Sequence, residues 1–224
     1  MAIPQPLASK TKMSLCTLRL TISRLLHRMR LRLPAMRDWK LRRYAAPSPA
    51  FIKAQVLLRN GVANATWVET GTYLGDTTDL LSRHASQVYS IEPAPNLLEH
   101  ARKRFRSSPN VHILAGTSEQ QLPQLLPTLS GDVNFWLDGH YSAGITYHGS
   151  VDTPIVTELA CIERQRERFG NIVVLIDDVR CFDPTIEEFA QYPSLDFLVD
   201  WARRNRFQWH IEHDIFVARK SAAK

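Results

Sequence analysis

The chain has 224 residues, of which 44% are hydrophobic, and this length and composition predict one packed domain with an appendage. The net charge of +6 is unevenly spread, because residues 1–43 hold eleven Lys and Arg residues against Asp38 alone, which leaves a net charge of −4 for the rest. This mildly acidic body offers no electrostatic track for nucleic acid, so we expect no nucleic-acid partner.

A basic amphipathic helix is predicted over residues 14–33. Its apolar side chains recur at steps of three and four, and its arginines lie mostly elsewhere on the helical wheel. No apolar run approaches the ~20 residues of a membrane span. Three roles stay open for this helix: packing on this chain or in a homodimer, peripheral contact with an anionic membrane surface, and organelle targeting. We interpret residues 1–45 as a basic N-terminal extension and residues 46–224 as the main domain.

Strands and helices alternate beyond the prolines that we interpret as the passage into the main domain, Pro34, Pro47 and Pro49. Hydrophobic periodicity predicts helices over Phe51–Asn60, Asp76–Arg83, Asn96–Arg106, Glu119–Leu125, Pro154–Arg168 and Ser194–Arg204. It predicts strands over Thr66–Glu69, Gln87–Glu92, Val111–Ala115, Val133–Leu137 and Ile172–Ile176. Residues 207–218 contain two β-rich runs with no room for a crossover helix, which indicates an antiparallel hairpin. The expected fold is α/β, a doubly wound and mostly parallel sheet that ends in this hairpin.

The most informative segment follows the first predicted strand. Glu69 is followed by Gly71 and Gly75, and Glu92 ends the second predicted strand. The glycines allow a tight turn whose backbone N–H groups approach a ligand, and Glu92 is placed to accept hydrogen bonds from ribose hydroxyls. Glu69 stands where a pyrophosphate binder keeps glycine, which favours a ligand with a positive end. S-adenosylmethionine, with its sulfonium and ammonium groups, is such a ligand.

This pattern resembles the first motif of the class I S-adenosylmethionine-dependent methyltransferases, with matches at Glu69, Gly71, Gly75 and Glu92. The resemblance covers roughly residues 60 to 218 and implies a Rossmann-like, seven-stranded sheet in which a reversed seventh strand lies between the fifth and sixth. It also implies that Glu69 and the turn from Gly71 through Thr72 to Gly75 hold the methionine part of the cofactor, and that Glu92 holds the ribose.

Ser118 is another candidate site residue, because it follows the third predicted strand. In the resembled fold this place contacts the adenine, so Ser118 is a candidate for a hydrogen bond to the ring edge. Capping of the following helix explains it equally well, because Ser118 is followed by Glu119 and Gln121. Both interpretations stay open.

Two further strand ends are acidic. Asp138 follows the fourth predicted strand, and Asp177 and Asp178 follow the fifth. Ligands of open α/β sheets bind beyond the carboxyl ends of the strands, and several carboxylates in one cleft need a cation or protons to offset their repulsion. Mg²⁺ or a similar hard cation is the simplest candidate. Here the chain looks like the metal-dependent, catechol-type O-methyltransferases, which implies that Asp138, Asp177 and Asp178 hold the metal and that Asp138 lies at both the cofactor and the acceptor.

The loop after Asp138 departs from that family. The family commonly carries a lysine base shortly after the fourth-strand aspartate, whereas this chain has His140 and Tyr141. With an ordinary pKa near ~6.5, His140 is a candidate catalytic base, a candidate metal ligand, or a plain loop residue. Residues 139–153 are too long for an ordinary connection and are rich in Gly, His, Tyr and Ser, which predicts an acceptor-binding lid.

These observations predict a methyltransferase that moves a methyl group from S-adenosylmethionine to an oxygen of a small hydroxylated acceptor, with a divalent metal assisting. One alternative is a non-catalytic, cofactor-binding or regulatory subunit of the same fold that docks through its N-terminal helix. Another is an NAD-binding protein, which the missing G-x-G-x-x-G motif disfavours. The three widely spaced cysteines favour a reducing compartment, so we expect a cytoplasmic protein, with membrane-surface association as one option for the helix.

Overall fold

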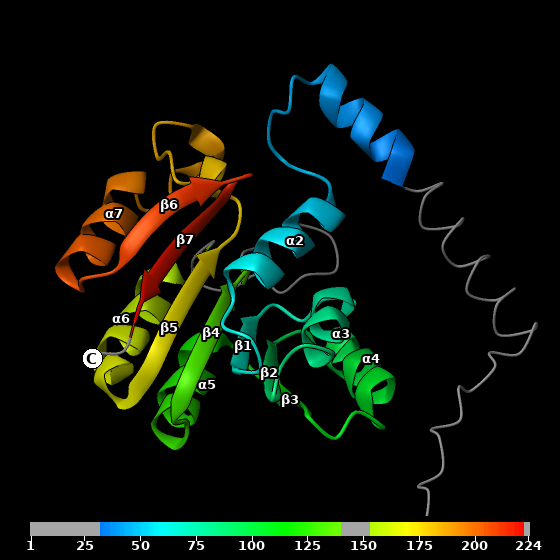
Figure 1. Ribbon diagram of the computed structural model, residues 1–224, viewed down its shortest axis with the longest axis vertical. Coiled ribbons are helices and arrows are strands. Elements are labelled where there is room, and N and C mark those ends of the chain that lie inside the picture. The colour runs from blue at the N-terminus through cyan, green and yellow to red at the C-terminus, as the bar shows by residue number, and fades with distance from the viewer. Residues whose placement is uncertain (1–31, 140–152, 222–224) are drawn as a thin grey trace, which may run out of the picture. The chain divides into compact units, whose positions relative to one another are not determined.

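The computed structural model describes residues 32–139 and 153–221. The chain divides into two compact units, residues 1–45 and residues 46–224, and each is described by itself (Figure 1). Within the described ranges, no helix is both long and apolar enough to cross a membrane.

In the first unit a helix covers residues 32–41. The predicted helix over residues 14–33 lies outside the described residues except for its last two positions. Pro34 belongs to the described helix, so interpreting it as part of a break was wrong. Proline lacks an N–H, so the backbone hydrogen bond it removes would have run only to residue 30. On this helix, the Trp39 indole donates to the carbonyl oxygen of Ala45 (3.0 Å), and its ring meets Tyr44 edge-on.

The second unit is built on a seven-stranded sheet in the order β3-β2-β1-β4-β5-β7-β6. All neighbours pair in parallel except β7, which is antiparallel to both β5 and β6 (Figure 1). The strands are β1 (Thr66–Thr70), β2 (Gln87–Glu92), β3 (Val111–Ala115), β4 (Gly131–Leu137), β5 (Phe169–Ile176), β6 (Gln208–Glu212) and β7 (Ile215–Lys220). The predicted parallel sheet, terminal hairpin and reversed seventh strand between the fifth and sixth are confirmed.

Six α-helices accompany the sheet in the described part of the second unit: α2 (Ala50–Asn60), α3 (Asp76–Ser82), α4 (Pro95–Phe105), α5 (Ser118–Leu125), α6 (Ile155–Gln165) and α7 (Leu195–Arg204). Short 3₁₀ turns cover Leu126–Thr128, Arg166–Arg168, Val179–Cys181 and Glu187–Phe189. Helix α6 ends three residues earlier than predicted, because the chain tightens into the 3₁₀ turn before it enters β5.

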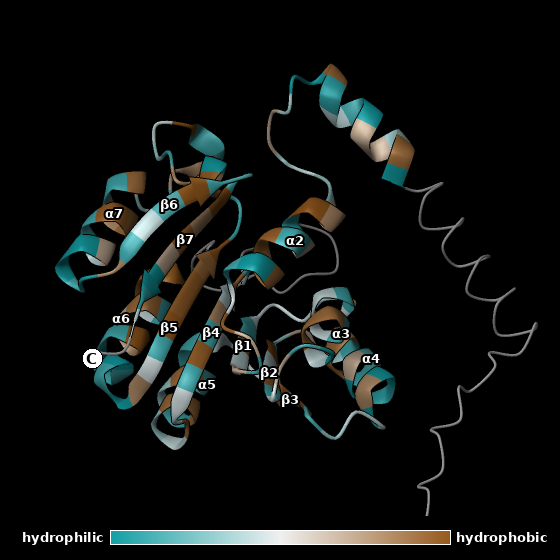
Figure 2. Ribbon diagram, in the orientation of Figure 1, coloured by the Kyte–Doolittle hydropathy of each residue, from teal (hydrophilic) through white to brown (hydrophobic). Residues whose placement is uncertain are grey.

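Side chains alternate between the two faces of the sheet. On β5, Ile172, Val174 and Ile176 belong to one hydrophobic cluster, whereas Val173 and Leu175 belong to another. Helices α5, α6 and α7 cover the first face, α2 and α3 cover the second, and α4 lies beside α3 (Figure 1). Figure 2 shows the hydrophobic colour along β5, as expected for a parallel strand that is buried on both faces.

Strands β4 and β5 both begin earlier than predicted. The pairing of β4 with β5 is irregular at its start, where Oδ1 of Asp132 accepts the backbone N–H of Asn171 (2.7 Å). Further along β4, the fully buried Asn134 fixes the segment after α2. Its amide accepts the N–H of Val62 (2.9 Å) and donates to the carbonyl oxygen of the same residue (3.0 Å). A side chain that satisfies both groups of one residue holds α2 in register with the sheet.

Candidate functional site

The glycine turn lies between β1 and α3, at the carboxyl edge of the sheet. Gly71 has a φ of +87°, and a β-carbon added there would lie 2.7 Å from the carbonyl oxygen of Asp138, so only glycine allows the two loops to approach this closely. Gly75 has a φ of +83°, and a β-carbon there would meet the ring of Phe105 at 2.8 Å. Gly71 therefore shapes the cleft edge between β1 and β4, whereas Gly75 makes room for packing against α4.

Glu69 lies beneath this turn and is 0% exposed. Its Oε2 accepts hydrogen bonds from the hydroxyls of Thr78 (2.5 Å) and Ser90 (2.6 Å), and the Thr72 and Ser90 hydroxyls are 2.6 Å apart. Oε1 of Glu69 is buried and has no hydrogen-bond partner among the described residues. Burial, opposed by the two hydroxyls, raises the pKa of Glu69 to about 7. The carboxyl group thus ties the turn to α3 and β2, and its predicted contact with the cofactor stays a prediction.

Glu92 ends β2 on the other side of the turn. Its Oε2 accepts the backbone N–H of Tyr73 (2.8 Å), and its Oε1 accepts that of Ala94 (2.9 Å). Burial raises the pKa of Glu92 against the effect of these two bonds. Each carboxylate oxygen keeps further acceptor capacity, so both can still bind hydroxyl groups of a ligand. The side chain is therefore held in one orientation at the place where the sequence predicts a ribose.

Ser118 is the first residue of α5, and the helix cap is Thr117. Thr117 and Gln120 form a reciprocal capping box, so the interpretation of Ser118 as the cap was wrong. The cap begins one residue earlier because Thr117 has the extended backbone that a capping residue needs. Ser118 itself is buried, and its contact with the adenine stays a prediction.

Glu158 on α6 is a buried acid that sequence reasoning missed. It is 1% exposed, burial raises its pKa to about 7, and its Oε1 has no hydrogen-bond partner among the described residues. A β-carbon added at Gly139 would lie 3.1 Å from Oγ1 of Thr70 and 3.4 Å from Oε1 of Glu158, so both atoms flank the start of the loop after β4. The sequence carried a signal for this burial, because Glu158 lies on the same helix face as the buried Ile155 and Ile162.

The three predicted aspartates converge. Oxygen atoms of Asp138, Asp177 and Asp178 all lie within 4.8 Å of one another, because β4 and β5 are parallel neighbours whose ends, Leu137 and Ile176, are paired. Asp177 and Asp178 are buried. Asp178 has a φ of +55°, a left-handed conformation that turns the chain into the 3₁₀ turn at Val179–Cys181.

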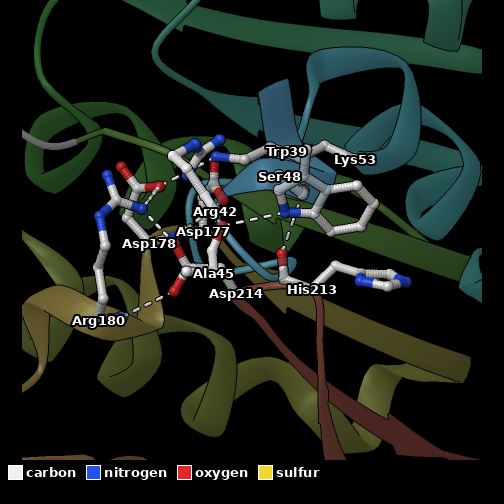
Figure 3. Close-up of polar contacts among 10 residues, drawn as sticks. All are labelled: Trp39, Arg42, Ala45, Ser48, Lys53, Asp177, Asp178, Arg180, His213 and Asp214. Carbon is white, nitrogen blue, oxygen red and sulfur yellow. Dashed lines mark hydrogen bonds and ion pairs between the residues drawn. The ribbon is translucent and has the colours of Figure 1, made fainter. Parts of the chain in front are cut away.

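A lysine that the sequence analysis did not consider enters this cluster. Lys53, on the first turns of α2, places its Nζ 2.6 Å from Oδ2 of Asp177 and 3.0 Å from Oδ1 of Asp178 (Figure 3). Burial alone would lower the pKa of Lys53, but the charges and hydrogen bonds of the two aspartates raise it. Lys53 lies three and four residues before the buried Val56 and Leu57, so its place on the inward face of the helix was a readable signal.

Arg180 is a second cation at the cluster. Its Nη1 lies 2.6 Å from Oδ1 of Asp178 and also pairs with Asp214, in the turn between β6 and β7 (Figure 3). Burial opposes the positive charge, but Asp178 and Asp214 outweigh it and raise the pKa of Arg180. Burial and repulsion from Asp138 and Asp178, against attraction by Lys53, raise the pKa of Asp177 to about 7.

These contacts bear on the predicted Mg²⁺ site. Three carboxylates suit a hard cation, but that prediction rested on the need for a cation to offset their repulsion. Lys53 and Arg180 already supply two positive charges, and Lys53 lies within hydrogen-bond distance of two of the three proposed ligands. The residues therefore do not fit a divalent metal. The predicted base His140 and most of the predicted lid lie outside the described residues.

No family model and no curated protein matches the sequence. Among solved structures, the chain is similar to the N-methyltransferase NodS from Bradyrhizobium japonicum WM9, with 13% identity over 77% of this chain and 95% of that chain and a TM-score of 0.52. The complex of NodS with S-adenosyl-L-homocysteine matches with 14% identity, 77% and 86% coverage, and a TM-score of 0.50. An rRNA methylase from Streptococcus thermophilus aligns over 80% of this chain and 99% of that chain at 14% identity, with a TM-score of 0.47. The NodS likeness shows that the chain has the class I methyltransferase fold.

Proposed function

We propose that this protein transfers a methyl group from S-adenosylmethionine to an oxygen of a small hydroxylated acceptor. The observation that carries the proposal is the oriented carboxylate of Glu92, which faces the Gly71 turn at the carboxyl edge of a sheet in the class I strand order. Ligands of open α/β sheets bind at this edge.

The residues present fit the cofactor. Glu92 can accept hydrogen bonds from vicinal hydroxyls while two backbone N–H groups hold it in place. Gly71 leaves the edge between β1 and β4 without a side chain. Glu69 supports this turn from below, so we propose it as a positioning residue together with Thr72, while Ser118 stays a candidate for the adenine. When bound, S-adenosylmethionine supplies a methyl group activated by a sulfonium.

We assign the binding of the methyl acceptor to the ends of β4 and β5. Asp138 follows β4, beside the Gly71 turn, and we propose that it orients a hydroxyl group of the acceptor. His140 remains the predicted base for the hydroxyl proton. Because the described cluster does not fit a divalent metal, metal assistance is left out of the proposal. The oxygen acceptor is inferred from the Tyr, His and Ser content of residues 139–153, and NodS is by its name an N-methyltransferase.

Calorimetric titration of the full chain with S-adenosylmethionine, and separately with NAD, tests the cofactor assignment. We expect micromolar binding of S-adenosylmethionine, no binding of NAD, and an affinity for S-adenosylmethionine that falls about 10-fold or more in Glu92→Gln, because the amide turns one acceptor oxygen into a donor. Glu99→Gln is the matched control, since Glu99 is exposed and pairs only with the neighbouring Lys103 in the described contacts. Binding of NAD, or of neither ligand by folded protein, would refute the proposal.

A second candidate function is a non-catalytic, cofactor-binding subunit that docks through the N-terminal extension. The basic charge of residues 1–43 favours it, and we propose the extension as a docking segment for a membrane surface or a second copy of the chain in either case. Binding of S-adenosylmethionine without turnover of any hydroxylated acceptor in a broad screen would favour this candidate over the enzyme.

A further inference from the structure

The position of Lys53 is determined by the packing of α2. Val56 and Leu57, one turn further along the helix, are 0% and 1% exposed and belong to the cluster that covers one face of the sheet. Asn60 at the end of the helix donates to the carbonyl oxygen of Val56 in the same helix (3.0 Å) and to Oε2 of Glu212 at the end of β6 (3.3 Å). The helix is therefore fixed against the sheet. Its first turns place the Lys53 side chain at the ends of β4 and β5, where this side chain is 19% exposed.

The ammonium group occupies the acceptor atoms that a metal would need. Oδ2 of Asp177 binds Lys53, and its Oδ1 accepts the backbone N–H of Asp178 (2.8 Å). Oδ1 of Asp178 is shared by Lys53 and Arg180. A divalent cation bound to the same carboxylates would lie within a few ångströms of the ammonium, and repulsion at that distance in a partly buried site is strong. Lysine and metal are therefore alternative occupants of one cluster.

We propose that Lys53 is the built-in cation of the cluster formed by Asp138, Asp177 and Asp178, and that it excludes divalent metal ions from these carboxylates. Removing the ammonium group converts the cluster into a divalent-cation site, because three carboxylate groups with oxygen atoms within 4.8 Å then lose the cation that bridges Asp177 and Asp178. The proposal concerns the cluster alone and holds whether or not the protein transfers methyl groups.

The test is titration of the full-length protein with Mn²⁺, followed by electron paramagnetic resonance of the free ion. Lys53→Met is expected to bind Mn²⁺ at this cluster at least about 10-fold more tightly than wild-type protein does. Lys53→Met with Asp177→Asn should lose the acquired site. Lys103→Met is the matched control, because Lys103 forms an exposed ion pair with Glu99 and its loss should not create a site.

Thermal unfolding supplies an independent readout. Loss of one partner of a buried ion pair destabilises a protein, so Lys53→Met should melt below wild type, and Mn²⁺ should raise its melting temperature but not that of wild type. Lys53→Arg keeps the charge and should remain insensitive to Mn²⁺. Two results would overturn the proposal. One is Mn²⁺ binding by wild type that Asp177→Asn abolishes, a measurement that does not depend on the folding of any Lys53 variant. The other is folded Lys53→Met that binds no Mn²⁺.

Discussion

Replacement of Glu69 by glutamine isolates the effect of its buried carboxyl group on stability. The substitution preserves size and shape, and the glutamine carbonyl oxygen can still accept from the hydroxyls of Thr78 and Ser90. The amide nitrogen replaces Oε1, which has no hydrogen-bond partner in the described part of the chain. The variant therefore removes one ionisable group and changes little else in the network beneath the glycine turn.

The size of the effect follows from the pKa. Burial raises the pKa of Glu69 from 4.5 to about 7 in the folded protein. Stability contributed by the protonated carboxyl is fully present below pH 4.5 and is lost as the pH rises to about 7. At about 1.4 kcal/mol for each pH unit, the wild type loses about 3 kcal/mol over this window. Glu69→Gln does not titrate, so its free energy of unfolding should gain about 3 kcal/mol relative to wild type between these limits and stay level above them.

Urea unfolding followed by circular dichroism, at several pH values from about 5 to about 8, measures this difference. Other titrating groups, including Glu158, are present in both proteins and cancel in the comparison. Glu99→Gln serves as the control, because its exposed carboxyl should produce no such trend. A difference between Glu69→Gln and wild type that does not change with pH would show that Glu69 is ionised at ordinary pH in the folded state and would refute the reasoning.

Two further substitutions test the geometry of the sheet edge. Gly71→Ala and Gly131→Ala both place alanine at a positive φ, which costs about 1–2 kcal/mol, but only the first adds a contact at 2.7 Å, since nothing lies within 4 Å of the added β-carbon at Gly131. Calorimetry should therefore show lost binding of S-adenosylmethionine in Gly71→Ala and unchanged binding in Gly131→Ala, and equal binding by the two variants would contradict the close approach. Asn134→Ala leaves the N–H and carbonyl of Val62 without their side-chain partner and should lower the free energy of unfolding by about 2–4 kcal/mol, measured by urea unfolding. A loss below about 0.5 kcal/mol would mean that water replaces both bonds.

The fold was predictable because its signals are local. Strands buried on both faces form short apolar runs, and the alternation of such runs with amphipathic helices indicates a parallel sheet. The hairpin followed from the absence of room for a crossover helix between residues 207 and 218. Errors occurred where the pattern is weakest. The N-cap of α5 is one residue earlier than predicted, and Pro34 lies in a helix and not in a break. Helix caps and breaks depend on backbone conformation more than on hydrophobic periodicity.

The sequence by itself also determined that acidic residues gather at one edge, because the carboxyl ends of parallel strands lie at the same edge of a sheet. Glu92, Asp138 and Asp177 were identified in this way. Only the tertiary structure decided what balances the charge of Asp177. Lys53 precedes Asp177 by 124 residues, and its contact depends on the packing of α2 against the sheet. A buried carboxylate takes whichever cation the packing brings nearest, and here that cation is a lysine where the strand-end pattern alone had suggested a metal.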